Sequence, residues 1–390
     1  MHLSGWLVLG MALVVRFSSV PAEAQADRRV VDNLDSLRRE AARARPGTQI
    51  LLAPGEYTGG LSLLGIAGDS GRPVVLRSSD PKRPATFVRG GIQLSRVAHL
   101  EVRDLHIVGS STNGLNVDDG GRPDSPSHHV LISGLVVRDT GPQGNRDGIK
   151  LSGLDDFTVD RCTVERWGSG GSAVDMVGCR RGRITRCTFK QGGSNGVQAK
   201  GGSEAIEISG NLFESCGERA VNAGGSTGLP YFRPKPQGFE ARAIRVENNV
   251  FRGGACAVAF VGVDGAVVRN NTLWQPERWA FRILQETRLP EFVPSRNGVI
   301  EANIIVFRSD TWREGGLNIG PGTAPETFRF SKNAWYCIDR PDRSQPKLPT
   351  PETGAVVGQD PRFVNPTGGD FRLQPDSPAV GRGASTVVGQ

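Results

Sequence analysis

Ile208-Ser209-Gly210-Asn211-Leu212-Phe213 is one copy of a frame that recurs along this 390-residue chain. Val246-Glu247-Asn248-Asn249-Val250-Phe251 and Val268-Arg269-Asn270-Asn271-Thr272-Leu273 repeat it: a short strand, a turn residue, an asparagine and a second strand. Extending the frame gives one column of residues spaced 22 to 38 apart: Leu105, Leu135, Cys162, Cys187, Asn211, Asn249, Asn271, Asn303 and Asn333. This spacing fits a coil of three short strands, with loops inserted where the interval is longer. The chain is therefore predicted to be all-β and to fold as a right-handed parallel β-helix, a solenoid of about ten coils.

The chemistry of this column predicts a ladder. At each tight bend, backbone groups lose their strand partners, and a buried asparagine amide can bond to them and to the asparagines above and below. Asparagine also tolerates the left-handed backbone conformation that such bends use. Where the column holds Leu or Cys, we expect an apolar stack, so that Cys162 and Cys187 are buried and unreactive. A disulfide between them is possible but not required, and none of the six cysteines has a metal-binding spacing.

The two ends of the chain differ from the repeats. Trp6–Val15 is an apolar run too short to cross a bilayer, and Ala22-Glu23-Ala24 follows it as a cleavage-site pattern. We therefore predict a signal peptide over residues 1–24 and a secreted or periplasmic protein. Asp32–Arg45 has Leu34, Leu37, Ala41 and Ala42 on one face, which predicts an N-terminal capping helix within residues 25–47. Residues 48–340 are assigned to the β-helix, and the Pro- and Gly-rich residues 341–390 to a tail wrapped around it.

The net charge of +7 and the pI near 9.3 favour a polyanionic partner. No nucleic-acid motif accompanies the arginines, and no segment beyond the N-terminal run could span a membrane. An acidic polysaccharide is therefore the expected partner, with neither nucleic acid nor membrane involved, and we expect a monomer.

A second strand of each coil carries polar residues on its outward face. Adjacent coils lie about 4.8 Å apart, so alignment of these strands gathers seven residues on one patch of one sheet: Asp147, Lys150, Asp175, Gln198, Lys200, Arg219 and Asn222. Arg282 continues one of the columns. Two large insertions flank the patch: Gly224–Phe239 carries Tyr231, Arg233 and Lys235, and Gln285–Arg296 carries further charges. Loops rising beside a flat sheet could form a cleft for an extended polymer, although water-facing strand positions are often polar without any such role.

The segment Asn195–Gly225 resembles the parallel β-helix polysaccharide lyases of the pectate-lyase-like superfamily, in particular the chondroitinase B and alginate lyase family. That resemblance implies that Lys200, which ends the strand VQAK, is the Brønsted base. The family's arginine, one coil later, corresponds by strict alignment to Asn222, with Arg219 three residues earlier. Family members bind calcium through acidic residues just before the lysine, whereas this chain has Gly193 and Asn195 there.

β-Elimination from a uronic acid requires neutralisation of the carboxylate, a base for the C5 proton and an acid for the departing oxygen. We expect Lys200 and Arg219 to be catalytic, and six residues to bind substrate: Lys150, Gln198, Asn222, Tyr231, Arg233 and Arg282. Arg219, Arg233 or Arg282 could neutralise the carboxylate, or a calcium ion held by Asp147 and Asp175 could do so. Simple pairing of these two carboxylates with Lys150 is the alternative. A glycoside hydrolase using Asp147 and Asp175 as its acid pair, a C5-epimerase and a non-catalytic carbohydrate-binding or cell-surface protein are further alternatives.

Overall fold

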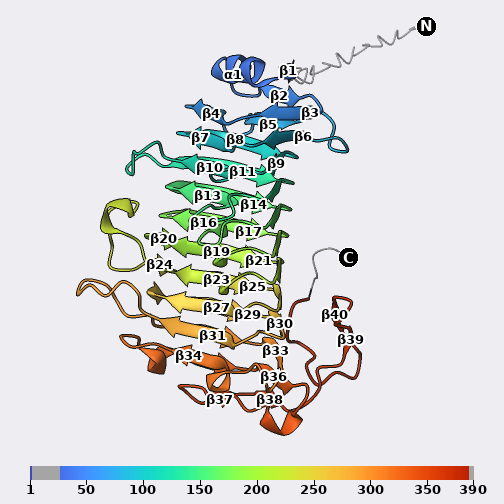
Figure 1. The fold of residues 1–390 in the computed structure, drawn as a ribbon, viewed down its shortest axis with the longest axis vertical. Coiled ribbons are helices and arrows are strands. Elements are labelled where there is room, and N and C mark those ends of the chain that lie inside the picture. The colour runs from blue at the N-terminus through green and yellow to red at the C-terminus, as the bar shows by residue number, and fades with distance from the viewer. Residues whose placement is uncertain (2–26, 386–390) are drawn as a thin grey trace.

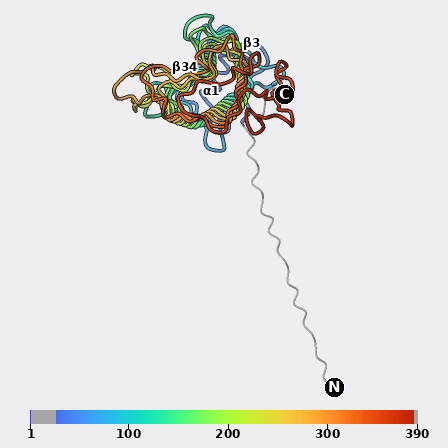
Figure 2. Tube along the Cα trace, turned by 90° about the horizontal axis from the view of Figure 1, so that it is seen from below, coloured from blue at the N-terminus to red at the C-terminus, as the bar shows by residue number. Residues whose placement is uncertain are grey.

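A computed structural model of the chain describes residue 1 and residues 27–385. The chain winds into stacked coils, each contributing a strand to two or three long parallel sheets (Figure 1). Viewed along the stack, successive coils superimpose around a continuous interior (Figure 2). The predicted signal peptide lies outside the described residues, apart from Met1. Within residues 27–385, no helix is both long and apolar enough to span a bilayer.

Sheet C carries the polar face predicted from the sequence. Its ten strands are β4 (Leu61–Leu64), β7 (Ile92–Ser95), β10 (Leu115–Asp118), β13 (Ile149–Ser152), β16 (Ser172–Val177), β19 (Asn195–Lys200), β23 (Arg219–Gly224), β27 (Cys256–Val261), β31 (Trp279–Leu284) and β34 (Leu317–Ile319).

Sheet B has twelve strands: β3 (Gly55–Thr58), β6 (Ala85–Val88), β9 (His106–Val108), β12 (Val136–Arg138), β15 (Thr163–Glu165), β18 (Thr188–Lys190), β22 (Leu212–Glu214), β26 (Val250–Arg252), β30 (Thr272–Trp274), β33 (Ile304–Phe307), β36 (Ala334–Cys337) and β38 (Val356–Val357). These strands correct the expected ten coils to about twelve. The frame misses coils at both ends of the stack because their column positions hold the small residues Gly55, Ala85 and Ala355 in place of Asn, Cys or Leu.

Sheet A has 16 strands: β1 (Arg28–Val31), β2 (Gln49–Leu52), β5 (Val74–Ser78), β8 (Ala98–Arg103), β11 (Ser127–Ser133), β14 (Leu154–Asp160), β17 (Arg180–Thr185), β20 (Ser203–Glu204), β21 (Glu207–Ser209), β24 (Ala241–Arg242), β25 (Arg245–Glu247), β28 (Val263–Asp264), β29 (Val267–Arg269), β32 (Val299–Glu301), β35 (Arg329–Ser331) and β37 (Glu352–Thr353). Short 3-10 turns lie at η1 (Leu229–Tyr231), η2 (Glu314–Gly316), η3 (Pro325–Thr327) and η4 (Pro341–Arg343).

The asparagine column lies at the bend between sheets A and B and forms a continuous ladder. The Nδ2 of Asn249 donates to the Oδ1 of Asn271 at 3.0 Å, and Asn271 donates to Asn303 at 2.9 Å. The ladder ends on Glu352, whose carboxylate accepts from the backbone N–H and the Nδ2 of Asn333. The left-handed conformation belongs to the residue before each asparagine, such as Asn270 with φ 53°, and not to the ladder residue as expected. The turn residue therefore makes the bend, and the asparagine satisfies the groups that the bend exposes.

All six cysteines are buried and free, so the disulfide considered between Cys162 and Cys187 is not formed. Instead, the backbone N–H of Cys162 donates to the Sγ of Cys187 at 3.4 Å, and the N–H of Cys187 donates to Asn211. The two thiols therefore extend the column beyond the asparagines, as the sequence predicted.

Inward-facing residues of all three sheets fill the interior. One inward column of sheet C is completely buried along its length: Leu115, Ile149, Val174, Val197, Val221, Val258 and Phe281. In sheet B, the rings of Phe213 and Phe251 stack with centroids 4.8 Å apart. Each such side chain contributes roughly 1.5–3 kcal/mol by its burial, so the stack is held together mainly by apolar contacts between coils.

Helix α1 (Leu34–Ala42) covers the N-terminal end of the stack (Figure 1). The side chain of Asn33 accepts from the N–H of Ser36 in a capping box, and Leu37 and Ala41 are buried. Ala42, expected on the same face, is exposed. Strand β1 precedes the helix and pairs with β2, so the predicted cap region also contains the first strand.

The regular coils continue past the predicted boundary at residue 340, because β37 and β38 add strands to sheets A and B. Only then does the tail fold back along the outside of sheet B. Its antiparallel hairpin, β39 (Phe363–Asn365) and β40 (Asp370–Leu373), buries Phe363 and Phe371 in a small apolar cluster with Val250 and Ile304.

Candidate functional site

On the outward face of sheet C, the predicted site residues are aligned from coil to coil as the repeat predicted. Lys150 pairs with Asp175 in the next coil, Asp175 with Gln198, and Gln198 with Asn222. Val177 pairs with Lys200, which places Lys200 diagonally across from Asp175. Strand alternation and coil stacking therefore bring the polar residues of four successive coils together.

Two buried carboxylates hold Lys150. Its Nζ contacts the Oδ2 of Asp175 and lies 3.6 Å from the Oδ2 of Asp147. Both carboxylates are 1 % exposed. Burial, followed by the negative charge of Asp175, raises the pKa of Asp147 to about 6 against the opposing charge of Lys150. Burial acts to lower the pKa of Lys150, but the two carboxylates outweigh it and raise that pKa. Lys150 is therefore a permanent cation of the site.

Lys200 reaches the same cluster from the neighbouring coil. Its Nζ lies 3.6 Å from the Oδ1 of Asp175 and donates to the Oε1 of Gln198 at 3.1 Å. The Oδ1 of Asp175 accepts no hydrogen bond among the described residues. Lys200 is thus anchored by an amide and faces a carboxylate oxygen that has room for a further donor.

A cavity of about 340 Å³ lies in front of the two lysines. Residues of sheet C form its floor: Lys150, Ser152, Val177 and Lys200. Residues of the 225–239 loop form its wall: Ser226, Thr227, Gly228, Tyr231 and Arg233. Asn145, from the loop before β13, completes the lining. Four predicted site residues, Lys150, Lys200, Tyr231 and Arg233, therefore line one cavity. Three of them are cations, so the cavity suits an anionic ligand.

Arg233 is fixed in the cavity wall by a residue that sequence reasoning missed. Its Nε lies 2.8 Å from the Oδ2 of the fully buried Asp119, which follows β10. Burial raises the pKa of Asp119, and the charge of Arg233 opposes that rise. Arg233 also packs on Gly178, where a Cβ would lie 2.4 Å from the Cβ of the arginine. A glycine is needed here because the loop approaches the sheet so closely.

Glu240, which was also not predicted from the sequence, connects the two large insertions. Its completely buried carboxylate accepts from the N–H of Gly201 at 3.0 Å, from the N–H and Oγ1 of Thr227, and from the Oγ1 of Thr287. The rings of Phe232 and Phe292 meet with centroids 5.5 Å apart. The insertions therefore form one packed wall. No repeat or motif marks a single glutamate at the end of a loop, so no sequence signal identified it.

The other predicted residues lie beside the cavity and do not line it. Arg219 donates to Glu286 at 2.7 Å and to Asn222 at 3.4 Å. Arg282 donates to Asn318 and lies over the ring of Trp279 at 4.6 Å. Burial and the charge of Arg219 lower the pKa of Arg282. These two arginines extend the basic surface along sheet C, away from Lys200.

The arrangement of Asp147 and Asp175 does not fit a calcium site. Calcium takes six to eight oxygen ligands, whereas these carboxylates face the ammonium groups of Lys150 and Lys200. The remaining Oδ1 of Asp147 accepts from the N–H of Ser172 at 2.7 Å. The two carboxylates instead form ion pairs with Lys150, which is the alternative considered from the sequence.

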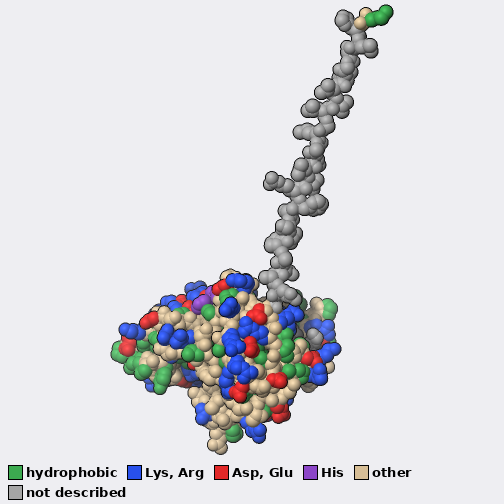
Figure 3. All heavy atoms as spheres, turned by 90° about the horizontal axis from the view of Figure 1, so that it is seen from above, with side chains coloured by type: hydrophobic (Ala, Val, Ile, Leu, Met, Phe, Trp, Pro, Cys, Tyr) green, Lys and Arg blue, Asp and Glu red, His purple; other side chains and the backbone are tan. Residues whose placement is uncertain are grey.

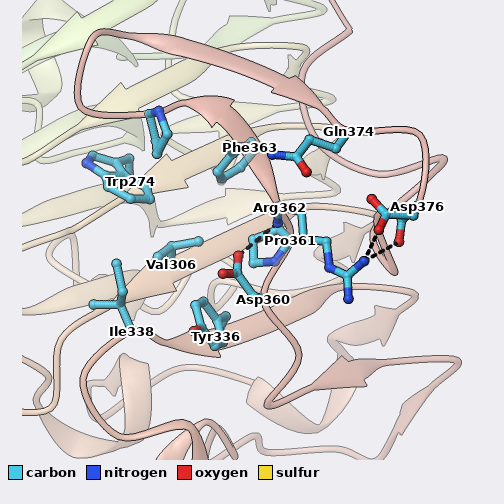
Figure 4. Close-up of a pocket in the computed structure, with 11 residues that line it drawn as sticks. Trp274, Val306, Tyr336, Ile338, Asp360, Pro361, Arg362, Phe363, Gln374 and Asp376 are labelled. Carbon is cyan, nitrogen blue, oxygen red and sulfur yellow. Dashed lines mark hydrogen bonds and ion pairs between the residues drawn. The ribbon is translucent and has the colours of Figure 1, made fainter.

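A second cavity, of about 430 Å³, lies between the tail and sheet B (Figure 4). Trp274 and Tyr336 line it, together with Asp360 and Gln374. The one arginine in its lining, Arg362, is paired with Asp376. With one cation and two carboxylates, Asp360 and Asp376, among its described lining residues, this cavity is less suited to a polyanion than the one beside Lys200, which three cations line.

Comparison with known proteins agrees with the fold. The family model described as the right-handed β-helix region matches residues 90–277. The chain is thus a right-handed parallel β-helix, which confirms the fold class predicted from the sequence. No curated protein sequence matches the chain.

Solved structures of enzymes acting on polysaccharides share this fold. Pectate lyase Pel9A is 14% identical, with 87% of this chain and 84% of that chain covered and a TM-score of 0.56. The A-module of the mannuronan C-5 epimerase AlgE4 from Azotobacter vinelandii is 15% identical over 85% and 97% of the chains, with a TM-score of 0.56. A PL6 family polysaccharide lyase from Pseudopedobacter saltans is 13% identical over 91% and 98%, with a TM-score of 0.54. The predicted resemblance to β-helix polysaccharide lyases is confirmed at the level of the fold.

Proposed function

We propose that this protein is a secreted or periplasmic polysaccharide lyase that cleaves a uronate-containing polysaccharide by β-elimination. The observation that carries the proposal is the cavity that Lys200 lines together with two further cations, Lys150 and Arg233, and with Tyr231. A uronate carboxylate needs cations, and its C5 proton needs a base close by.

In this proposal, Arg233 and Lys150 bind the uronate carboxylate and neutralise its charge, which makes the C5 proton more acidic. Lys200 acts as the Brønsted base that removes that proton and later releases it to solvent. The electron pair of the C5–H bond forms the C4–C5 double bond, and the C4–O bond breaks. The leaving oxygen takes a proton from the Tyr231 hydroxyl, which recovers it from solvent.

For Arg219 we propose a different role from the catalytic one expected from the sequence. The resemblance made it a catalytic candidate, three residues before the aligned position at Asn222, but it is bound to Glu286 and does not line the cavity. We assign Arg219 and Arg282, with Gln198 and Asn222, to binding of neighbouring sugar units along sheet C.

A C5-epimerase would use the same proton abstraction and differ only in returning a proton to C5. A glycoside hydrolase would use Asp147, whose pKa of about 6 suits a general acid. That carboxyl is, however, buried beside Lys150, so we favour elimination.

The test is incubation of the purified protein with alginate, pectate, and chondroitin and dermatan sulfates. Ultraviolet absorbance detects unsaturated uronate products, and proton NMR detects epimerised residues and new reducing ends. Unsaturated product from at least one polymer is expected. Absence of such product from all of them, with and without calcium, would refute the lyase proposal, and new saturated ends or epimers would identify the alternatives.

Lys200→Ala should abolish turnover and leave the thermal unfolding temperature within a few degrees of the wild-type value. Lys190→Ala is the matched control, because Lys190 lies in sheet B and pairs with Glu214 at 3.8 Å. Full activity of Lys200→Ala would remove Lys200 from the mechanism.

A further inference from the structure

Three of the five histidines in the sequence meet on the outer surface of sheet A. His99 lies in β8, and His128 and His129 lie in β11 of the next coil. The strands pair Ala98 with His128, and Leu100 with Val130, so His99 stands directly above His129. Sheet A is separate from the sheet C site, so this cluster is independent of the proposed function.

The local backbone turns these side chains toward one another. His99 and His129 both have left-handed backbones, with φ values of 47° and 54°. Asp156 and Arg181 repeat this conformation in the following coils. Histidine is one of the few residues enriched at such left-handed positions. The side chains of the left-handed residues in successive coils form a column on the outside of the sheet.

The imidazole rings are close enough to share an ion. A nitrogen of each ring lies within 4.8 Å of a nitrogen of the other two. The Nδ1 atoms of His128 and His129 are 2.9 Å apart, and the rings of His99 and His129 stack with centroids 4.5 Å apart. Two imidazole ligands on a tetrahedral zinc ion, at the usual Zn–N distance, have nitrogens about 3.3 Å apart. Small rotations of the rings reach that arrangement.

The surroundings of the three rings leave a position open for an ion. The nearest carboxylates, Asp155 and Asp156, are both bound by Arg181. Histidine side chains reach the surface of the molecule as seen from its N-terminal end (Figure 3).

We propose that His99, His128 and His129 form a binding site for a divalent transition-metal ion of the zinc class. Neutral imidazole is a preferred ligand of Zn²⁺, Ni²⁺ and Cu²⁺. Three protein ligands leave the fourth position of a tetrahedral ion to water or to an oxygen of a ligand. An ion bound here would link two successive coils.

The test is titration of the full chain, carrying no histidine tag, with Zn²⁺ alone in a calorimeter. One high-affinity ion per chain is expected. His99→Asn and His129→Asn keep the left-handed backbone, which asparagine accepts, and His128→Gln keeps the size of the side chain. Each should weaken binding by more than the roughly 10–100-fold typical for loss of an outer-sphere partner, and the triple variant should lose the site.

His106→Gln is the matched control, because His106 lies in sheet B and its variant retains all three proposed ligands. Undiminished zinc affinity in the triple variant, or no tight binding by the wild-type chain, would overturn the proposal. If the triple variant does not fold, electron paramagnetic resonance of Cu²⁺ bound to the wild-type chain decides the question. Splitting from three imidazole nitrogens supports the site, and its absence refutes it.

Discussion

The Oδ1 of Asp175 lies 3.6 Å from the Nζ of Lys200, while its Oδ2 contacts Lys150. One buried carboxylate thus orients both lysines of the candidate site. Because Lys150 is held charged by two carboxylates and Lys200 is held by only one, neighbouring lysines of one sheet have different environments.

Asp175→Asn should lower both stability and activity. Removing one partner of a buried ion pair typically costs 3–5 kcal/mol of unfolding free energy. We expect about 3 kcal/mol, because Lys150 keeps Asp147 nearby. Urea unfolding measures this loss, and kcat should fall more than KM rises, since Lys200 loses its orientation. The double variant Lys150→Met, Asp175→Leu should recover most of the stability but none of the activity, and equal stability losses in the single and double variants would contradict the pairing.

Asp147 should make stability depend on pH between about 4 and 6. Its folded-state pKa is raised to about 6 from the ordinary value of 3.8, so the folded state binds its proton more tightly than the unfolded state does. The stabilisation from this group is complete below about pH 4 and is lost as pH rises through 6. The difference in unfolding free energy between wild type and Asp147→Asn should therefore fall over that range. A difference that is constant with pH would contradict the shift.

Asn271→Ala should destabilise the coils strongly. Its Oδ1 accepts from the N–H and Nδ2 of Asn249, and its Nδ2 donates to the carbonyl of Val246. Each buried group left without a partner costs about 1–3 kcal/mol, so a loss of roughly 3 kcal/mol or more is expected in urea unfolding. Cys187→Ala, in the same column, is the control and should cost only about 1 kcal/mol. Equal losses would mean that the column acts by packing alone.

The six thiols should not react in the folded protein. Burial raises the pKa of Cys179 and of Cys256 to about 12 and also raises the pKa of Cys216, so thiolate is scarce at neutral pH. A thiol reagent should detect none of them under native conditions and all six after unfolding. Reducing agent should leave the unfolding temperature unchanged, and a shift would indicate a disulfide.

The face of sheet C could be predicted because it depends on two local rules. Alternation along a strand decides which side chains point outward, and the recurring asparagine decides how the coils align. The sequence therefore predicted that Lys150, Asp175 and Lys200 lie close together, and they do so in the structure. The same frame could not count the outermost coils; at the C-terminal end Ala355 takes the register position of the asparagine and Glu352 supplies the acceptor.

The wall of the cavity could not be predicted because its conformation depends on contacts between distant parts of the chain. Arg233 and Tyr231 were candidates from their charge and aromaticity. The sequence contains no sign, however, that Asp119 fixes Arg233, or that Glu286 draws Arg219 away from the cavity. These partners are single acidic residues outside any repeat, and only the folded loops bring them into range.

The carboxylate of Glu240 binds both insertions at once, through Thr227 of the first and Thr287 of the second. The two loops therefore form a single structural unit. A graft that exchanges either loop alone with that of another β-helix protein would break the Glu240 hydrogen bonds to that loop, two with Thr227 or one with Thr287, together with the Phe232–Phe292 contact. Changes of substrate preference in this scaffold should thus require the two insertions to be exchanged as a pair.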